Sequence, residues 1–255
     1  MAGEPGFAPD EIKARAVASR QRSIELAAMS NASAARPEWD FNHVIAYGQS
    51  LSSGWEGWPA LSVVQQHDSL MIGDSVHGTS ESGQHFEVAG DLTFRPLVAT
   101  VMSNGNKGEV LAADAVAALK PDSLALGETV LEGALDFWRS RQCMRGHEAD
   151  MARRFVATSC GVGGRTIEQL GFGKPLFGRP SSAVDIGRRL AEAAGGSYGI
   201  AALLWLQGEN NSVGLNGTQD RADYVRLTAA LQADFNREIV RGIAGQGRMP
   251  AVFTH

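Results

Sequence analysis

Three polar, glycine-containing turns stand out in this sequence, because each directly follows a short apolar run. They comprise Gly48, Gln49 and Ser50 in the first turn, Gly161 to Gly164 in the second, and Gln207, Gly208 and Glu209 in the third. A serine hydroxyl in a tight turn after a strand can act as a nucleophile, and backbone N–H groups there can stabilise a developing oxyanion. Each of these three turns, taken alone, is typical of an ordinary connection after a strand. Together they indicate one polar site, provided that the fold brings them together.

The segments around these turns alternate between short apolar runs and helix-like segments. The predicted strands are 43–47, 154–158, 200–206 and 250–254, and the predicted helices are 109–119, 128–142, 183–195 and 219–244. This alternation predicts a three-layer α/β/α fold with a flavodoxin-like parallel sheet that is covered on both faces. Since parallel strands end at the same edge of a sheet, we expect the three turns to converge where α/β folds bind their ligands.

The chain divides into an N-terminal extension and one large domain. Residues 1–36 contain an amphipathic segment and are predicted as a helical extension, while residues 37–255 form the α/β domain. Residues 52–108 are rich in Gly, Ser, His and Asn and show weak periodicity. We therefore predict that they form a long inserted loop region after the first strand.

The composition narrows the classes of function. The chain has 255 residues, 44% of them hydrophobic, with a net charge of −5 and a pI of about 5.7, which argues against nucleic-acid binding. No export signal and no apolar stretch of about 18 residues is seen, so a cytoplasmic location without a membrane partner is expected. Cys143 and Cys160 are too few for a disulfide framework. No metal-site pattern occurs, and no cofactor or metal is expected.

In this order, the three turns resemble motifs of the SGNH (GDSL-like) hydrolase superfamily, specifically its sialate O-acetylesterase and acetylxylan esterase branch. Residues 48–50 match the Gly-Gln-Ser of that branch, residues 205–209 match its Trp-x-Gln-Gly-Glu block, and residues 163–168 loosely match its glycine block. The resemblance covers roughly residues 42–254, except that residues 52–108 match nothing in the pattern. Two positions depart from the pattern: Leu51 stands where the branch has Asn, and Asn211 stands where it has Asp.

The resemblance implies a serine-dependent carboxylic-ester hydrolase that removes O-acetyl groups from a carbohydrate or small-molecule acetyl ester. Ser50 would be the nucleophile, and Glu209 would orient the histidine that accepts its proton. The oxyanion hole would consist of the backbone N–H groups of Ser50 and Gly164 and the side-chain amide of Gln207, each typically worth about 2.7–4 kcal/mol. The structural alternatives are that Glu209 caps the following loop and that Gln207 bonds a neighbouring strand end.

The histidine of this site is not evident. The superfamily takes it from an Asp-x-x-His motif near the C-terminus, and none follows Glu209. Of two earlier matches, His43 lies about six strand steps, roughly 20 Å, from Ser50, and His77 in the insertion is interpreted as a chance match. His255, at the end of the fourth predicted strand, is the candidate base. We therefore expect a C-terminally incomplete domain that is inactive in its 255-residue form.

Two other functions stay open. A catalytically silent carbohydrate-binding domain would keep the same fold, and Trp55 and Trp58 after the first turn could stack on a sugar ring or simply pack. A nucleotide-binding protein could use residues 161–164 as a phosphate loop. No Lys-Ser/Thr pair follows these glycines and the dinucleotide spacing is absent, so this function is disfavoured.

Overall fold

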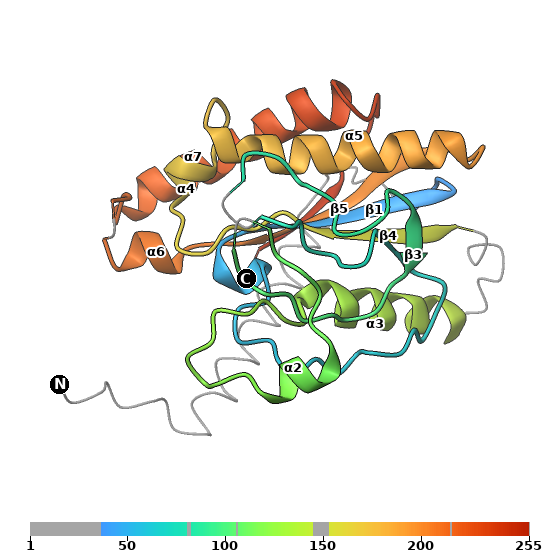
Figure 1. The fold of residues 1–255 in the computed structure, drawn as a ribbon. Helices are drawn as coiled ribbons and strands as arrows, with labels where there is room; N and C mark the ends of the chain where they lie inside the picture. The colour runs from blue at the N-terminus through green and yellow to red at the C-terminus, as the bar shows by residue number, and fades with distance from the viewer. Residues whose placement is uncertain (1–36, 81–82, 106, 145–152, 215, 255) are drawn as a thin grey trace. The chain divides into compact units, whose positions relative to one another are not determined.

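A six-stranded sheet forms the centre of the domain (Figure 1). This computed structural model describes residues 37–80, 83–105, 107–144, 153–214 and 216–254. The predicted extension 1–36 and the candidate base His255 lie outside the described residues. In spatial order the strands are β3 (Phe94–Pro96), β2 (Leu70–Ile72), β4 (Arg154–Ser159), β1 (Phe41–Gly48), β5 (Tyr198–Leu206) and β6 (Ala251–Thr254). Neighbouring strands are parallel except β2 and β3, which are antiparallel.

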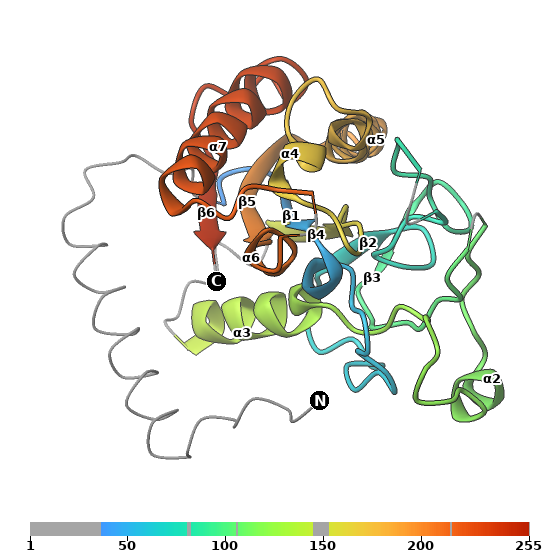
Figure 2. The same ribbon diagram turned by 90° about the vertical axis from the view of Figure 1, so that its left-hand side faces the viewer.

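Helices cover both faces of the sheet, as Figure 2 shows. They are α3 (Val130–Met144) on one face, and α5 (Gly178–Ala193) and α7 (Arg221–Asp234) on the other. Side chains alternate along β1, so that Ile45 and Tyr47 pack into the core under α5 and α7, while Val44 and Ala46 pack into the core beside α3. The predicted three-layer α/β/α fold is confirmed. Among the described residues, no helix combines the length and apolar character needed to cross a membrane.

Short helical turns follow the strands at the carboxyl edge of the sheet. These are η1 (Ser50–Ser52) after β1, α4 (Ile167–Leu170) and η3 (Pro175–Phe177) after β4, and α6 (Glu209–Ser212) after β5. The first and third predicted polar turns therefore run into the first residues of η1 and α6, where backbone N–H groups have no helical partner, and the second turn shortly precedes α4.

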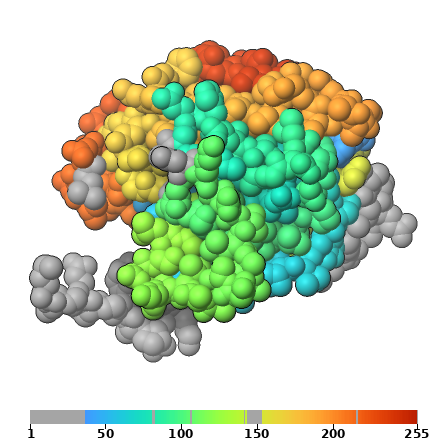
Figure 3. All heavy atoms as spheres, viewed as in Figure 1, coloured from blue at the N-terminus to red at the C-terminus, as the bar shows by residue number. Residues whose placement is uncertain are grey.

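Residues 52–108 differ from their prediction as a loop region, because they supply β2 and β3 to the sheet. Each of these strands has three residues, too few for an alternating pattern to be recognised. The predicted helix 109–119 is a single short helix, α2 (Ala113–Ala117). The predicted helix 219–244 is α7, which continues into the π-helical segment η4 (Phe235–Arg241). Figure 3 shows the inserted segment, in cyan and green, covering much of the face in view.

Candidate active site

The first turn depends on a glycine at the end of β1. Gly48 has a φ of 144°, and a Cβ atom at this position would lie 2.0 Å from the carbonyl oxygen of Leu206 on β5. The next amide, that of Gln49, donates to the same Leu206 oxygen at 2.8 Å. The chain then enters η1, where the Ser52 amide donates to the Gln49 carbonyl at 2.8 Å. Close contact between β1 and β5 thus places Ser50 directly beyond the edge of the sheet.

Ser50 is half-buried, and its reactive groups are available. Its carbonyl oxygen accepts from the backbone amides of Ser53, at 3.1 Å, and Trp55, at 3.3 Å. Within the described part of the chain, neither its hydroxyl nor its backbone N–H has a hydrogen-bond partner. An unpaired hydroxyl and an unpaired amide on one residue suit a nucleophile whose own N–H helps to bind the oxyanion.

Gly164 in the second turn also presents a backbone N–H group without a partner among the described residues. Its φ of 67° is in the left-handed region that favours glycine. The nearest heavy atom that a Cβ there would meet is Nδ2 of Asn210, 4.0 Å away. Counting only described residues, its backbone N–H also has no acceptor. Gly164 thus presents an unpaired N–H group in an open, exposed turn.

Hydrogen bonds join the turns to one another. The Gln49 side-chain oxygen accepts from the backbone amide of Asn210 at 3.2 Å and from Nε2 of Gln207 at 3.3 Å. Nε2 of Gln207 also donates to the carbonyl of Arg165, in the segment after β4, at 3.1 Å. The structure therefore brings the ends of β1, β4 and β5 together, as the parallel arrangement of these strands requires.

Gln207 is held by partners on all sides. Its amide nitrogen donates over 2.7 Å to Oδ1 of Asn211, in addition to the contacts above. The Tyr224 hydroxyl lies 2.6 Å from both the carbonyl oxygen and Oε1 of Gln207. Two N–H bonds are thus shared among three acceptors of the chain itself. The Gln207 amide can reach an oxyanion only by giving up one of these bonds, and as it stands it connects the strand ends.

Asn211, which the sequence marks only as a departure from the family pattern, is the centre of this network. Its Oδ1 accepts from Gln207 and, at 3.0 Å, from the backbone amide of Ile167. Its Nδ2 donates to Oε2 of Glu168 at 3.0 Å and to the Thr218 carbonyl at 3.2 Å. An aspartate has no N–H group for these two acceptors and would set a second carboxylate against Glu168. The asparagine is therefore explained by its partner on α4.

This arrangement predicts a charge conflict in the Asn211→Asp variant. Burial raises the pKa of Glu168, but hydrogen bonds from the Thr218 amide and from Asn211 outweigh it and hold the pKa below its usual value. We expect Asn211→Asp to lower the free energy of unfolding at pH 7 by about 2 kcal/mol, since one bond to a charged group is lost. The measurement is urea denaturation of Asn211→Asp, Glu168→Gln and the double variant. Glu168→Gln should restore most of the loss; strictly additive effects would contradict the proposed conflict.

Glu209 is the first residue of α6, and it is exposed. Its carbonyl accepts from the Ser212 hydroxyl at 2.7 Å. Burial raises the pKa of the Tyr224 hydroxyl, and the negative charge of Glu209 raises it further. The Glu209 carboxylate is therefore close enough to Tyr224 to act on it electrostatically. Its predicted role as the acid that orients a histidine stays a prediction.

The described histidines occupy different environments. His43 is fully buried within β1, with Nδ1 2.6 Å from the Tyr198 hydroxyl and Nε2 2.8 Å from Oγ1 of Thr158. Burial lowers its pKa to about 3. His43 is therefore a neutral core residue that cannot serve Ser50.

His77 lies at the carboxyl edge of the sheet, a position that could not be predicted from its place in the inserted segment. Its backbone pairs in parallel with Ser159 at the end of β4, and Ser159 donates its hydroxyl to the Ser52 carbonyl at 2.7 Å. Nε2 of His77 is 2.9 Å from the Gly127 carbonyl. Asp74, which begins the Asp-x-x-His match, instead pairs with Arg95 at 2.8 Å. The Asp-x-x-His spacing therefore does not correspond to an Asp–His contact, but His77 is linked to the turn of Ser50.

Comparison with protein-family models gave no match, and neither did comparison with curated protein sequences. Solved structures show partial likeness. A protein of Arabidopsis thaliana is 13% identical, with a TM-score of 0.43, over 84% of this chain and 85% of that one. A carbohydrate acetylesterase from Xanthomonas citri is 16% identical, with a TM-score of 0.37, over 82% of this chain. The matched part spans 40% of the acetylesterase chain.

Proposed function

We propose that this chain is a serine-dependent carboxylic-ester hydrolase in which Ser50 is the nucleophile. The observation that carries the proposal is the pair of unpaired backbone N–H groups, on Ser50 and Gly164, that accompanies the unpaired Ser50 hydroxyl within the described residues. A half-buried backbone amide such as that of Ser50 is normally paired, and Gly164 is exposed, so that its N–H is open to a ligand. Two donors and a hydroxyl without protein partners, all in turns at the edge where α/β sheets bind ligands, suit acyl transfer.

In the proposed reaction, the Ser50 hydroxyl attacks the acyl carbonyl carbon while a base accepts its proton. The N–H groups of Ser50 and Gly164 bind the negative charge that forms on the carbonyl oxygen. The intermediate then expels the alcohol, which takes the proton back from the base, and leaves an acyl group on Ser50. Water repeats the same steps and releases the acid. Gln207 and Asn211 act as positioning residues that hold the two turns together.

The base in this scheme is a histidine. His255 is the candidate from the sequence, with Glu209 as its proposed orienting acid. His77 is the described histidine that is linked to the Ser50 turn through Ser159. Separate substitution of His77 and His255 by Gln distinguishes them, because only the base should be required for hydrolysis at neutral pH.

We further propose that the substrate is an O-acetylated carbohydrate, which is what the resemblance of residues 48–50 and 205–209 implies. The test is release of acetate from acetylated xylan and from O-acetylated sialic acid, with p-nitrophenyl acetate as a general ester. Hydrolysis of p-nitrophenyl acetate without release of acetate from either carbohydrate ester would contradict the carbohydrate assignment while leaving the esterase intact.

The competing function is a catalytically silent carbohydrate-binding domain. It is favoured by one observation: no described histidine is hydrogen-bonded to Ser50. Carbohydrate binding without hydrolysis, in every form of the protein that contains residues 37–255, would establish this function and exclude the esterase.

A further inference from the structure

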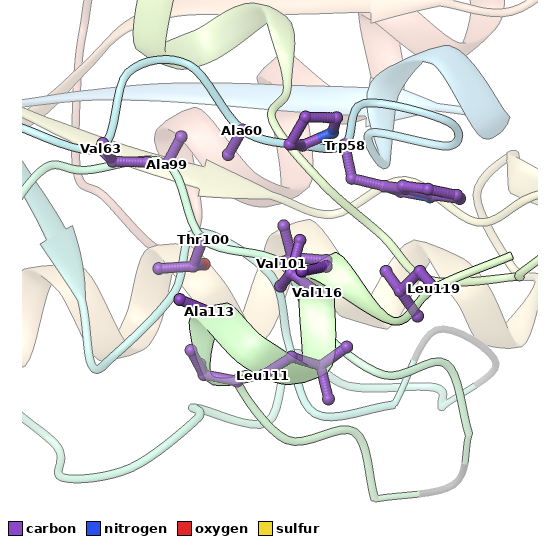
Figure 4. A pocket seen from close by; sticks show the side chains of 13 residues that line it. Trp58, Ala60, Val63, Ala99, Thr100, Val101, Leu111, Ala113, Val116 and Leu119 are labelled. Atoms are coloured by element: carbon purple, nitrogen blue, oxygen red, sulfur yellow. The ribbon is translucent and has the colours of Figure 1, made fainter. Parts of the chain in front are cut away.

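A cavity of about 620 Å³ lies between the insertion and residues 110–119, and its lining shares no residue with the polar network at the strand ends (Figure 4). Its walls come from three segments, 58–63, 99–101 and 110–119. Its volume falls in the range of small-molecule sites, about 300–1,000 Å³. Of the 13 lining residues, only Trp58 and Thr100 carry a polar side-chain atom, and none is charged.

The apolar side of α2 faces this cavity instead of a protein core. None of the five residues of α2, all of them described, is buried. Ala113, Val116 and Ala117 nevertheless line the cavity, at the spacing of one helical face. Figure 4 shows α2 with Val116 and Leu119 on one side of the space and the loop of Trp58 and Ala60 on the other. The helix thus presents an apolar surface to open volume.

Large apolar side chains are also exposed around this space. Val63 is 57% exposed and Val110 is 41% exposed, and both line the cavity. Leu61, beside the same loop, is 83% exposed. A group of exposed aliphatic side chains around a cavity is typical of a binding site for an apolar molecule.

The two polar groups of the lining differ in whether they have a hydrogen-bond partner. Oγ1 of Thr100 already has a partner, the Ser75 hydroxyl at 2.7 Å. The indole Nε1 of Trp58 is shielded from solvent and has no hydrogen-bond partner among the described residues. Because this nitrogen has almost no accessible surface even when the cavity is empty, an occupant of the cavity cannot reach it, and the lining side chains, all of them described, offer no free hydrogen-bond donor.

We propose that this cavity binds a neutral small molecule through an apolar alkyl chain. A carbohydrate is a poor occupant, because its hydroxyl groups would lose water without gaining partners on these walls. A fatty-acid anion is equally poor, because no lining residue offers a positive charge. The proposal goes beyond the esterase function and does not depend on Ser50.

Binding of 2-alkanones, from 2-pentanone to 2-decanone, tests the proposal on the full chain. These ketones have one acceptor and no hydrolysable bond, so binding is measured whether or not the protein is an esterase. Affinity should rise about fourfold for each added CH₂ group until the cavity is full. In NMR titrations, the indole N–H resonance of Trp58, assigned with Trp58→Phe, should shift on binding. Constant affinity along the series would overturn the proposal.

Two matched variants locate the ligand. Ala113→Phe places a large ring in the cavity from an exposed position, and Ala118→Phe makes the same change at the exposed C-cap of α2, outside the lining. We expect Ala113→Phe to weaken 2-decanone binding at least tenfold and Ala118→Phe to leave it within twofold. Trp58→Phe keeps an aromatic ring in the lining and should keep the increment per CH₂. Equal binding by Ala113→Phe and Ala118→Phe would place the ketone elsewhere.

The alternative occupant is a second copy of the chain. Sedimentation of the chain and of Ala113→Phe over a range of concentrations separates the two cases. A dimer that Ala113→Phe disrupts, together with no ketone binding, would replace the ligand site by a self-association surface and overturn the proposal.

Discussion

In any form of the protein that hydrolyses p-nitrophenyl acetate, Ser50→Ala is expected to lower kcat by about 10⁴-fold or more. Removal of the nucleophile eliminates the acyl-enzyme route, and only binding and the oxyanion donors remain to accelerate the reaction. The Ser50 hydroxyl makes no hydrogen bond to the described residues, so its removal breaks no internal contact. The melting temperature should therefore change little. Steady-state kinetics and a thermal scan on the same preparation measure both effects.

Ser53→Ala is the matched control in the same turn. Its hydroxyl donates over 3.1 Å to the Ser50 carbonyl and has no proposed part in the reaction. We expect Ser53→Ala to keep kcat within a few-fold of the unmodified protein. If Ser50→Ala retained activity within tenfold, or if both variants lost activity equally, Ser50 would not be the nucleophile.

The second large effect is a stability maximum between about pH 4.5 and 6.5. His43 has a usual pKa of 6.5, which burial lowers to about 3 in the folded state. Between these values the unfolded chain binds a proton that the folded chain does not. The free energy of unfolding therefore falls as the pH drops from 6.5 towards 3, by about 1.4 kcal/mol for each pH unit.

Glu132, at the start of α3, makes the free energy of unfolding depend on pH in the opposite direction. It is buried, Oε2 accepts from the Thr129 amide and hydroxyl at 3.0 and 2.6 Å, and Oε1 has no partner among the described residues. Burial raises its pKa from 4.5 to about 7. The folded chain holds this proton where the unfolded chain has lost it, so stability falls as the pH rises from 4.5 to 7. Between pH 4.5 and 6.5 the two contributions cancel.

Urea denaturation at half-unit steps from pH 3.5 to 8 measures this profile. In Glu132→Gln the plateau between pH 4.5 and 6.5 and the fall between pH 6.5 and 7 should disappear, so that stability rises continuously up to pH 6.5. Glu109→Gln makes the same change at an exposed carboxylate and should keep the profile of the unmodified chain. A Glu132→Gln profile parallel to that of Glu109→Gln would show that Glu132 does not titrate in this range.

The parts of the fold that could be predicted are those in which a sequence pattern extends over several residues. Apolar runs such as 200–206 are long enough to be recognised as strands, and the parallel arrangement then determines which turns converge. β2 could not be found in this way, because Leu70, Met71 and Ile72 are too few to show a period. The network could not be found either. Asn211 and Glu168 are 43 residues apart, and only the folded chain brings them within hydrogen-bond distance.

The sequence could not predict whether the proposed oxyanion donors are unpaired, and the reason is a different one. Gly164 and Ser50 can be proposed as oxyanion donors from a motif, but a motif does not tell whether an amide is already paired. Gln207 illustrates the difference, because its side chain fits the motif and yet is bonded to Asn211 and Arg165. The bond to Arg165 depends on the path of the segment after β4, and residues 205–209 alone contain no information about that path.

The antiparallel strand β3 protects one margin of the sheet against aggregation. A sheet margin with free backbone groups can recruit a strand from another molecule. β3 is only three residues long and contains Pro96, which has no N–H to donate, and Arg95, which forms ion pairs with Asp74 and Asp91 at 2.8 and 3.2 Å. A short strand with a proline and a paired charge is a poor template for intermolecular growth. The insertion therefore helps to keep newly made chains from joining into larger sheets.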